Sequence, residues 1–241
     1  MKFLIDLHTH TNTTPHAYSS LEENMKVAKE KGLVLVANTM HGPYLQDSPH
    51  WWAIANQRTL PDYINGVRVL KSVEANIVDT HGNLDINDKI IEICEIIIGG
   101  FHSIPEYGIT TDIDKNTTAM INTIKNGKLD ILVHLGNPEF PIDYEKVVIA
   151  AKEYNVAIEI NNGSLTTSRA GSRPNCEKII ELCSKYKPYI SLGSDAHFSG
   201  LVGELTEAVA LIGNYEKSLI LNSDIKNLKE FLFSRGKIIV R

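Results

Sequence analysis

The sequence predicts an α/β fold in which repeated β-α units surround a parallel sheet that closes, or nearly closes, into a barrel. Short apolar runs rich in strand-forming residues alternate with amphipathic stretches along the whole chain, as expected of such units. Seven strand candidates are present, and seven strands are difficult to arrange as a simple open sheet. They span residues 3–7, 33–38, 67–74, 96–101, 131–134, 156–161 and 189–194.

The segments between the strand candidates carry helix and turn signals. Ser20 and Glu23 form a capping-box pattern at the start of the first helix, and Gly32 stands where that helix should end. The turn residues His81-Gly82-Asn83 predict a small hairpin over residues 76–86. Later helices are expected at residues 87–94, 117–126, 143–154, 173–186, 203–212 and 224–234.

Length, charge and cysteine usage limit the class of protein. The 241 residues suit one large domain over residues 1–241, and the formal net charge of −5 argues against an extended nucleic-acid track. No apolar run approaches a membrane span or a signal-peptide core, so we expect a cytoplasmic protein. The three cysteines form no CxxC pair and are expected to fill the core: Cys94, Cys176 and Cys183.

Histidines are concentrated at the ends of the strand candidates. Six of the nine fall at or just after such an end, namely His8, His10, His41, His102, His134 and His197. In a parallel barrel the carboxyl ends of the strands meet on one face, so these residues are expected to be neighbours despite their separation in the chain. Glu74 ends the third strand candidate and is expected on the same face.

Two short segments show metal-ligand spacing. Asp6, His8 and His10 alternate along an extended run, so their side chains are expected on one side, where the two imidazoles grip a metal and Asp6 fixes a tautomer by accepting a hydrogen bond. Asp195 and His197 repeat this spacing near the other end of the chain. We therefore expect a carboxylate and several imidazoles from both termini to share one site.

The expected ligand set is rich in nitrogen and oxygen and contains no thiolate, which suits zinc, manganese or iron. There are too many ligands for one ion, and two or three divalent ions fit the number. With two anionic ligands, Glu74 and Asp195, such a pocket carries a net positive charge and should attract a phosphate.

Several candidates have weaker local signals. The pattern around His16 leaves it open between a surface histidine and a ligand, and His50 and His81 fit ordinary surface positions better than ligation. His50, beside two tryptophans, is nevertheless our candidate substrate-side residue. Arg169 follows the sixth strand candidate and is either a phosphate contact, since a guanidinium holds two oxygens at once, or a solvated loop residue.

The ordered set of these motifs resembles the PHP superfamily, named for polymerase and histidinol phosphatase, and most closely its YcdX-type branch. Each motif is weak alone, but the full ordered set is specific and covers nearly the whole chain. The motifs are Asp6-Leu7-His8-Thr9-His10, His16-Ala17-Tyr18-Ser19, His41-Gly42-Pro43, Ser48-Pro49-His50-Trp51-Trp52, Glu74-Ala75-Asn76-Ile77, Gly100-Phe101-His102, His134 with Gly136-Asn137-Pro138, Glu159-Ile160-Asn161-Asn162 and Gly193-Ser194-Asp195-Ala196-His197.

The resemblance implies a distorted (β/α)7 TIM-like barrel in one domain, three divalent metal ions with zinc foremost, and a possible homotrimer. By position, the first ion would take His8, His10, Glu74 and Asp195. A second would share Glu74 and add His102 and His134, and a third would take His16, His41 and His197. Two positions depart from the usual pattern: Met40 stands where relatives usually have Asp, and Leu135 stands where a proline is common.

The sequence therefore predicts a phosphoesterase that hydrolyses a small phosphate monoester with metal-activated water. Asp195, His197 and His102 are the expected catalytic residues, and Arg169 and His50 the expected substrate contacts. The first alternative is phosphodiesterase or nuclease activity on the same metal cluster. The second is a noncatalytic metal-binding module, towards which Met40 is the one hint.

Overall fold

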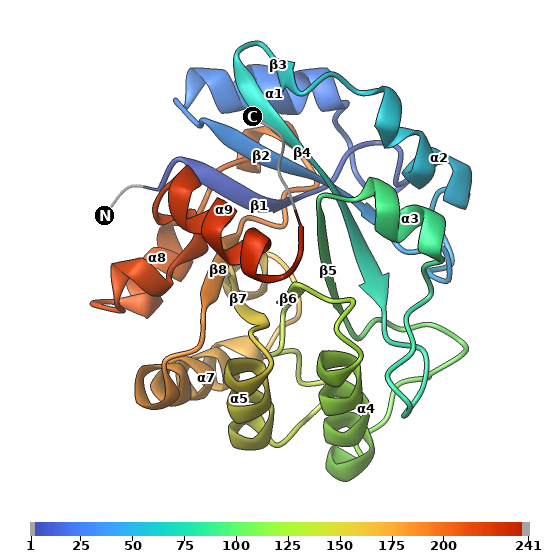
Figure 1. Cartoon of the computed structure of the whole chain (residues 1–241), viewed down its shortest axis with the longest axis vertical. Coiled ribbons are helices and arrows are strands. Elements are labelled where there is room, and N and C mark those ends of the chain that lie inside the picture. Colours follow the sequence, from blue (N-terminus) through green and yellow to red (C-terminus); the bar gives the residue numbers. More distant parts are fainter. Residues whose placement is uncertain (1–2, 238–241) are drawn as a thin grey trace.

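The computed structural model describes residues 3–237, in which seven parallel strands form a nearly closed barrel with helices around it (Figure 1). The strands neighbour one another in chain order, and the expected fold class, a distorted (β/α)7 barrel, is confirmed. The barrel strands are β1 (Ile5–Thr9), β2 (Leu35–His41), β4 (Val67–Asn76), β5 (Ile96–Gly100), β6 (Ile131–Leu132), β7 (Ala157–Asn161) and β8 (Ile190–Gly193). A two-residue strand that the sequence did not indicate, β3 (Tyr63–Ile64), pairs antiparallel with β4.

The expected helices are present, with starts that follow their capping residues. Ser20 and Glu23 form the predicted capping box. The helix expected at residues 117–126 begins earlier, at Ile113, because the Asp112 carboxylate accepts a hydrogen bond from the Lys115 N–H at 2.9 Å. The helices are α1 (Leu21–Glu30), α3 (Asp88–Ile93), α4 (Ile113–Lys125), α5 (Tyr144–Glu153), α7 (Ser172–Tyr186), α8 (Thr206–Ile212) and α9 (Ile225–Ser234).

Two short helices were not expected from the sequence. They are α2 (Trp51–Ala55) and α6 (Asn162–Thr166), each of five residues and too short to show helical periodicity. The predicted hairpin is present as an antiparallel bridge between Ile77 and Leu84. All three cysteines are free and buried, as expected.

The apolar core lies in two main layers. One surrounds the sheet beneath the outer helices, and the other fills the end of the barrel where the strands begin. At that end Leu228, Phe231 and Leu232 of α9 pack on strand residues, and α9 lies across the barrel (Figure 1). The opposite end, where the strands stop, is left for polar side chains. No helix among residues 3–237 has both the length and the apolar character needed to cross a membrane.

The seam between β8 and β1 is closed mainly by side chains. Asp6 accepts hydrogen bonds from the Ser194 N–H at 3.0 Å, the Ser194 hydroxyl at 2.6 Å and the Gly203 N–H at 2.8 Å. At the other end of the seam the Asn222 amide donates to the Ile5 and Leu192 carbonyls at 2.9 and 2.8 Å. These buried bonds replace a regular ladder, and only a parallel bridge between Thr9 and Ala196 is formed there within the described chain.

A β-bulge in β1 changes which side chains face the barrel interior. Asp6 is paired with Val36 and Thr9 with Asn38, so two residues, Leu7 and His8, stand opposite one residue of β2. Leu7 packs in the apolar interior, and His8 lies one position further along in the polar end. The bulge thus breaks the alternation expected from the sequence, and Asp6 faces the seam instead of sharing a side with His8.

Candidate metal centre

Polar side chains from six of the seven barrel strands meet at the end where the strands stop. Each lies within the last three residues of a strand or follows the strand closely, and most are almost fully buried. Since these strand ends converge, residues nearly two hundred positions apart become neighbours. The cluster, called here the histidine cluster, comprises His8, His10, His41, Glu74, His102, His134, Asp195 and His197.

Glu74 lies at the centre of the histidine cluster and is inaccessible to solvent. Its Oε1 is 3.1 Å from His102 Nε2 and 2.7 Å from His134 Nε2. Its Oε2 is 3.3 Å from His8 Nε2, 3.4 Å from His10 Nε2 and 3.1 Å from His41 Nδ1. One carboxylate therefore has five imidazoles around it, two on one oxygen and three on the other, which is the arrangement of a bridging ligand.

Asp195 forms the second anionic part of the histidine cluster. Its Oδ1 is 3.2 Å from His10 Nε2 and 3.5 Å from His8 Nε2. Its Oδ2 accepts a hydrogen bond at 2.8 Å from the Arg169 guanidinium. Arg169 is therefore not the solvated loop residue of the alternative interpretation, since it is paired with a site carboxylate.

His16 joins the histidine cluster from the loop after β1. Its ring stacks on His197 with centroids 4.7 Å apart and lies 5.1 Å from the ring of His41. On its other side Nδ1 contacts the Asp47 carboxylate, a partner that the sequence did not reveal. Unlike the buried members, the His16 side chain is 42% exposed, so it lies at the rim.

Burial and neighbouring charges set the protonation of the cluster. Burial lowers the pKa of His134 to about 3, with the Arg169 charge acting in the same direction. Burial also lowers the pKa of His10 well below its ordinary value. For Glu74, burial raises the pKa but the charges of His8, His102 and His41 outweigh it, so the pKa is well below its ordinary range. Burial lowers the pKa of His8, but the nearby carboxylates, that of Glu159 foremost, outweigh burial and raise the pKa well above its ordinary value. Neutral imidazoles and ionised carboxylates are the forms that bind metals, so His8 releases a proton when it binds one.

Several buried polar atoms of the histidine cluster have no hydrogen-bond partner among residues 3–237. They include His10 Nδ1, His41 Nε2, His102 Nδ1 and Asp195 Oδ1. A buried polar atom left unpaired costs about 1–3 kcal/mol, so several in one place need a compensating ligand. Three sets of donor atoms here are close enough to hold an ion: His10, His41 and His197; His8, His10 and Glu74; and His41, Glu74 and His102. The donors therefore fit bound divalent metals.

Two site residues have left-handed backbone conformations, which are uncommon outside glycine. The φ angle is 39° at His134 and 56° at Asp195, and the adjacent Arg169 has 48°. Such conformations cost of order 1 kcal/mol each and persist where the surroundings hold them. The chain therefore carries local strain at residues of the site.

Glu159, on β7, orients the first histidine of the cluster. Its Oε1 is 2.7 Å from His8 Nδ1, and its Oε2 accepts hydrogen bonds from the His134 N–H and the Asn161 amide, both at 3.0 Å. The prediction that Asp6 fixes a histidine tautomer was wrong, because the bulge turns Asp6 into the seam. The position of Glu159 in the second half of a strand candidate, two residues before its end, was the signal that could have indicated this role.

We expect Glu159→Gln to weaken metal binding about 10- to 100-fold, since the charged acceptor that holds the His8 ring is lost. Metal content after dialysis against a graded chelator series measures the change. Glu153→Gln, at an exposed position on α5, is the matched control. Equal metal retention in both variants would contradict this role of Glu159.

The remaining candidates lie outside the histidine cluster. His50 caps α2, where its Nδ1 accepts the Trp52 N–H at 3.3 Å, and its ring contacts both tryptophans. A substrate-side role for His50 stays a prediction. His81 is exposed in the hairpin turn. Met40 is buried against the apolar layer that includes Ile54, on the opposite side of β2 from His41.

Comparisons with known proteins agree with this fold and site. No protein-family model matches the chain. A "probable phosphatase" from Thermoanaerobacter sp. (strain X514) is 45% identical, with 99% of this chain and 98% of the relative covered. A "probable phosphatase" from Clostridium novyi (strain NT) is 43% identical over the same shares. Among solved structures, a histidinol phosphate phosphatase from Lactococcus lactis, complexed with Zn, L-histidinol and phosphate, superposes with a TM-score of 0.60 at 13% identity, covering 88% of this chain and 93% of that one.

The barrel and its histidine cluster define a metal-dependent phosphatase with a PHP-like fold. The chain is more than 40% identical to two of the probable phosphatases over nearly the full length of both sequences, which shows its family. The chain belongs to the family of these bacterial probable phosphatases and is a hydrolase of phosphoric esters.

Proposed function

We propose that this protein hydrolyses a phosphate monoester at a trinuclear metal site. The observation that carries the proposal is the position of Glu74, whose two oxygens lie within 3.4 Å of nitrogens from five histidines. A carboxylate with donors grouped on both oxygens suits two ions, and His16, His41 and His197 add a further group of rings beside it. The ligand chemistry favours zinc, with manganese and iron as alternatives.

The proposed assignment gives the first ion His8, His10, Glu74 and Asp195, and the second Glu74, His102 and His134. The third ion takes His16, His41 and His197. Divalent ions at these positions supply activation of the attacking water and neutralisation of the phosphate charge. The zinc and phosphate that accompany L-histidinol in the Lactococcus lactis phosphatase support this chemistry for a protein of similar fold.

The chain's own residues position the ester for displacement at phosphorus. The water gives up a proton as its oxygen forms a bond to phosphorus. The bond to the ester oxygen breaks, and that oxygen leaves with its electron pair and takes up a proton, giving an alcohol and inorganic phosphate. Asp195, His197 and His102 are the proposed catalytic residues, and the partial exposure of His197 supports a contact between its ring and the substrate. Arg169 is the proposed phosphate contact.

Metal content and turnover test this proposal together. We expect the tag-free protein to bind two to three divalent ions and to hydrolyse p-nitrophenyl phosphate, with turnover lost on chelation and restored by zinc or manganese. Elemental analysis and phosphate release are the measurements. A fully metal-loaded protein that cleaves bis(p-nitrophenyl) phosphate but no monoester would overturn the monoester assignment, and failure to bind metal would overturn the site.

Arg169 allows a sharper test of phosphate binding. We expect Arg169→Ala to lower kcat/KM about 100-fold and to weaken inhibition by inorganic phosphate, because a charged bidentate donor is removed. Arg169→Lys should recover only part of this loss, since an ammonium is a point charge. Arg173→Ala, in an exposed pair with Glu207, is the control. An unchanged kcat/KM in Arg169→Ala would exclude Arg169 as the phosphate contact and leave it only the ion pair with Asp195.

A further inference from the structure

A cavity of about 540 Å³ opens beside the histidine cluster, and both polar and apolar side chains line it. The polar lining includes Arg169, Asp195 and His197. The apolar lining consists of Tyr18, Phe198 and Leu201, called here the apolar wall. The cavity therefore joins the proposed phosphate position to a surface suited to an apolar group.

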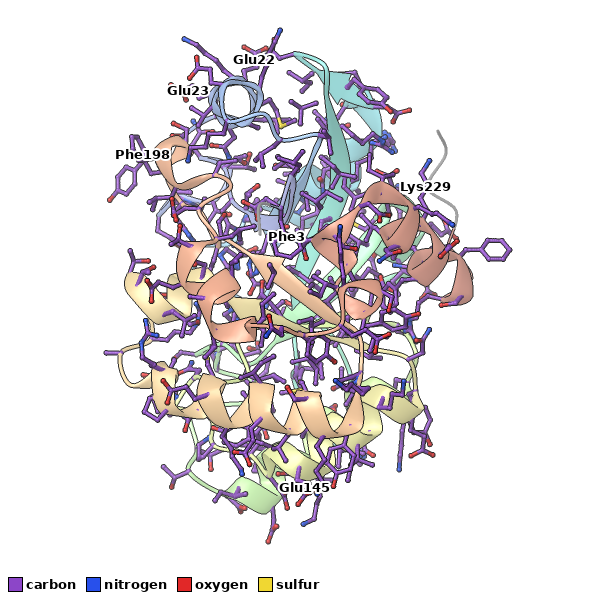
Figure 2. All side chains as sticks on the ribbon, turned by 90° about the vertical axis from the view of Figure 1, so that its left-hand side faces the viewer. Phe3, Glu22, Glu23, Glu145, Phe198 and Lys229 are labelled. Carbon is purple, nitrogen blue, oxygen red and sulfur yellow. The ribbon has the colours of Figure 1, made fainter. Side chains whose placement is uncertain are left out.

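The three side chains of the apolar wall are exposed to solvent, although burial of apolar surface would stabilise the fold. The exposed fractions are 81% for Tyr18, 55% for Phe198 and 39% for Leu201. In Figure 2 Phe198 lies at the edge of the molecule, on the same side as Glu22 and Glu23 of α1. Exposed apolar side chains are unremarkable singly, but three gathered at a cavity with convergent polar groups are typical of a ligand site.

The backbone fixes the apolar wall relative to the histidine cluster. The Tyr18 N–H donates to the His197 carbonyl at 2.8 Å, and Phe198 is the next residue in the chain. The Phe198 ring lies over Gly200, where a Cβ would meet its Cε1 at 2.8 Å. Gly200 thus leaves room for the ring, and both aromatic residues are anchored to a member of the site.

We infer that the apolar wall receives the leaving group, so that the substrates are monoesters of alcohols carrying a flat, apolar ring. The inference rests on the proposed function, because it assumes that phosphate lies against the polar lining of the same cavity. An ester bound in this way places its phosphoryl group near Arg169 and its ring between Tyr18 and Phe198. When the P–O bond breaks, the ring-bearing alcohol leaves along the wall and phosphate stays against the polar lining.

Benzyl phosphate and ethyl phosphate form a matched pair of substrates, because both release primary alcohols and differ mainly in the ring. For the metal-loaded wild-type protein we expect kcat/KM to be about 10- to 100-fold higher for benzyl phosphate, the range that a modest apolar group gains in a fitting pocket. Tyr18→Ala and Phe198→Ala should each reduce the benzyl-to-ethyl ratio, and the double variant should bring it close to one. Phe233→Ala, which removes an exposed ring from α9, should keep the wild-type ratio.

Equal ratios in the wild type and the double variant, with both esters turned over, would overturn the inference. So would an altered oligomeric state of the double variant with an unaltered ratio, since the wall would then contact another copy of the chain. If neither ester is hydrolysed, the proposed function fails, and calorimetry with benzylphosphonate and methylphosphonate tests the wall separately. Tighter wild-type binding of benzylphosphonate, lost in the double variant, would support the inference, and equal binding of the two would overturn it.

Discussion

Replacing Glu74 with glutamine is expected to lower kcat/KM by about 1,000-fold or more and to reduce the number of bound metal ions. The two oxygens of the Glu74 carboxylate together contact five histidines. An amide of nearly the same shape keeps the packing but removes the negative charge and one acceptor oxygen. Loss of a single well-placed electrostatic contact costs 100- to 1,000-fold in other enzymes, and a bridging ligand acts on two ions at once.

Elemental analysis and initial rates on one preparation measure the effect of Glu74→Gln. Glu177→Gln, at an exposed position on α7, is the matched control and should retain wild-type metal content and rate. A cooperative urea transition for Glu74→Gln shows that the barrel still folds. Full activity and metal content in this variant would rule out Glu74 as the bridging ligand.

Asn222→Ala is expected to lower the free energy of unfolding by about 3 kcal/mol. The Asn222 side chain makes three buried hydrogen bonds across the seam: to the Ile5 and Leu192 carbonyls and from the Leu192 N–H, at 2.9, 2.8 and 2.7 Å. Each bond contributes about 1 kcal/mol net, and alanine leaves three buried backbone groups without a partner. Because β8 and β1 lack a regular ladder, few other contacts of this kind hold that end of the barrel closed.

Urea unfolding followed by circular dichroism measures this change. Asn214→Ala, at an exposed position after α8, is the control and should stay within about 0.5 kcal/mol of the wild type. The Asn222 variant should also keep its metal content if it is assayed well below its unfolding midpoint, since Asn222 lies away from the histidine cluster. A loss below about 1 kcal/mol would show that water or backbone movement satisfies the freed groups.

The sequence by itself was sufficient to predict the barrel and the residues that lie together at the carboxyl ends of its strands. Apolar runs of strand length and amphipathic helix patterns are local signals, and each expected strand and long helix is present. The capping box at Ser20 and Glu23 formed as predicted because its hydrogen bonds join residues three positions apart. The histidines at the strand ends became neighbours because strand direction alone decides which end of a parallel barrel a residue occupies.

The tertiary structure alone decided which residues support the site and how the barrel closes. The bulge at Leu7 and His8 depends on pairing with β2, so the alternation of β1 wrongly placed Asp6 beside the imidazoles. Glu159 reaches His8, and Asn222 reaches Ile5, across sequence separations of 151 and 217 residues. Hydrogen bonds between distant segments leave no periodic trace in a sequence, because their geometry arises only when the strands have come together.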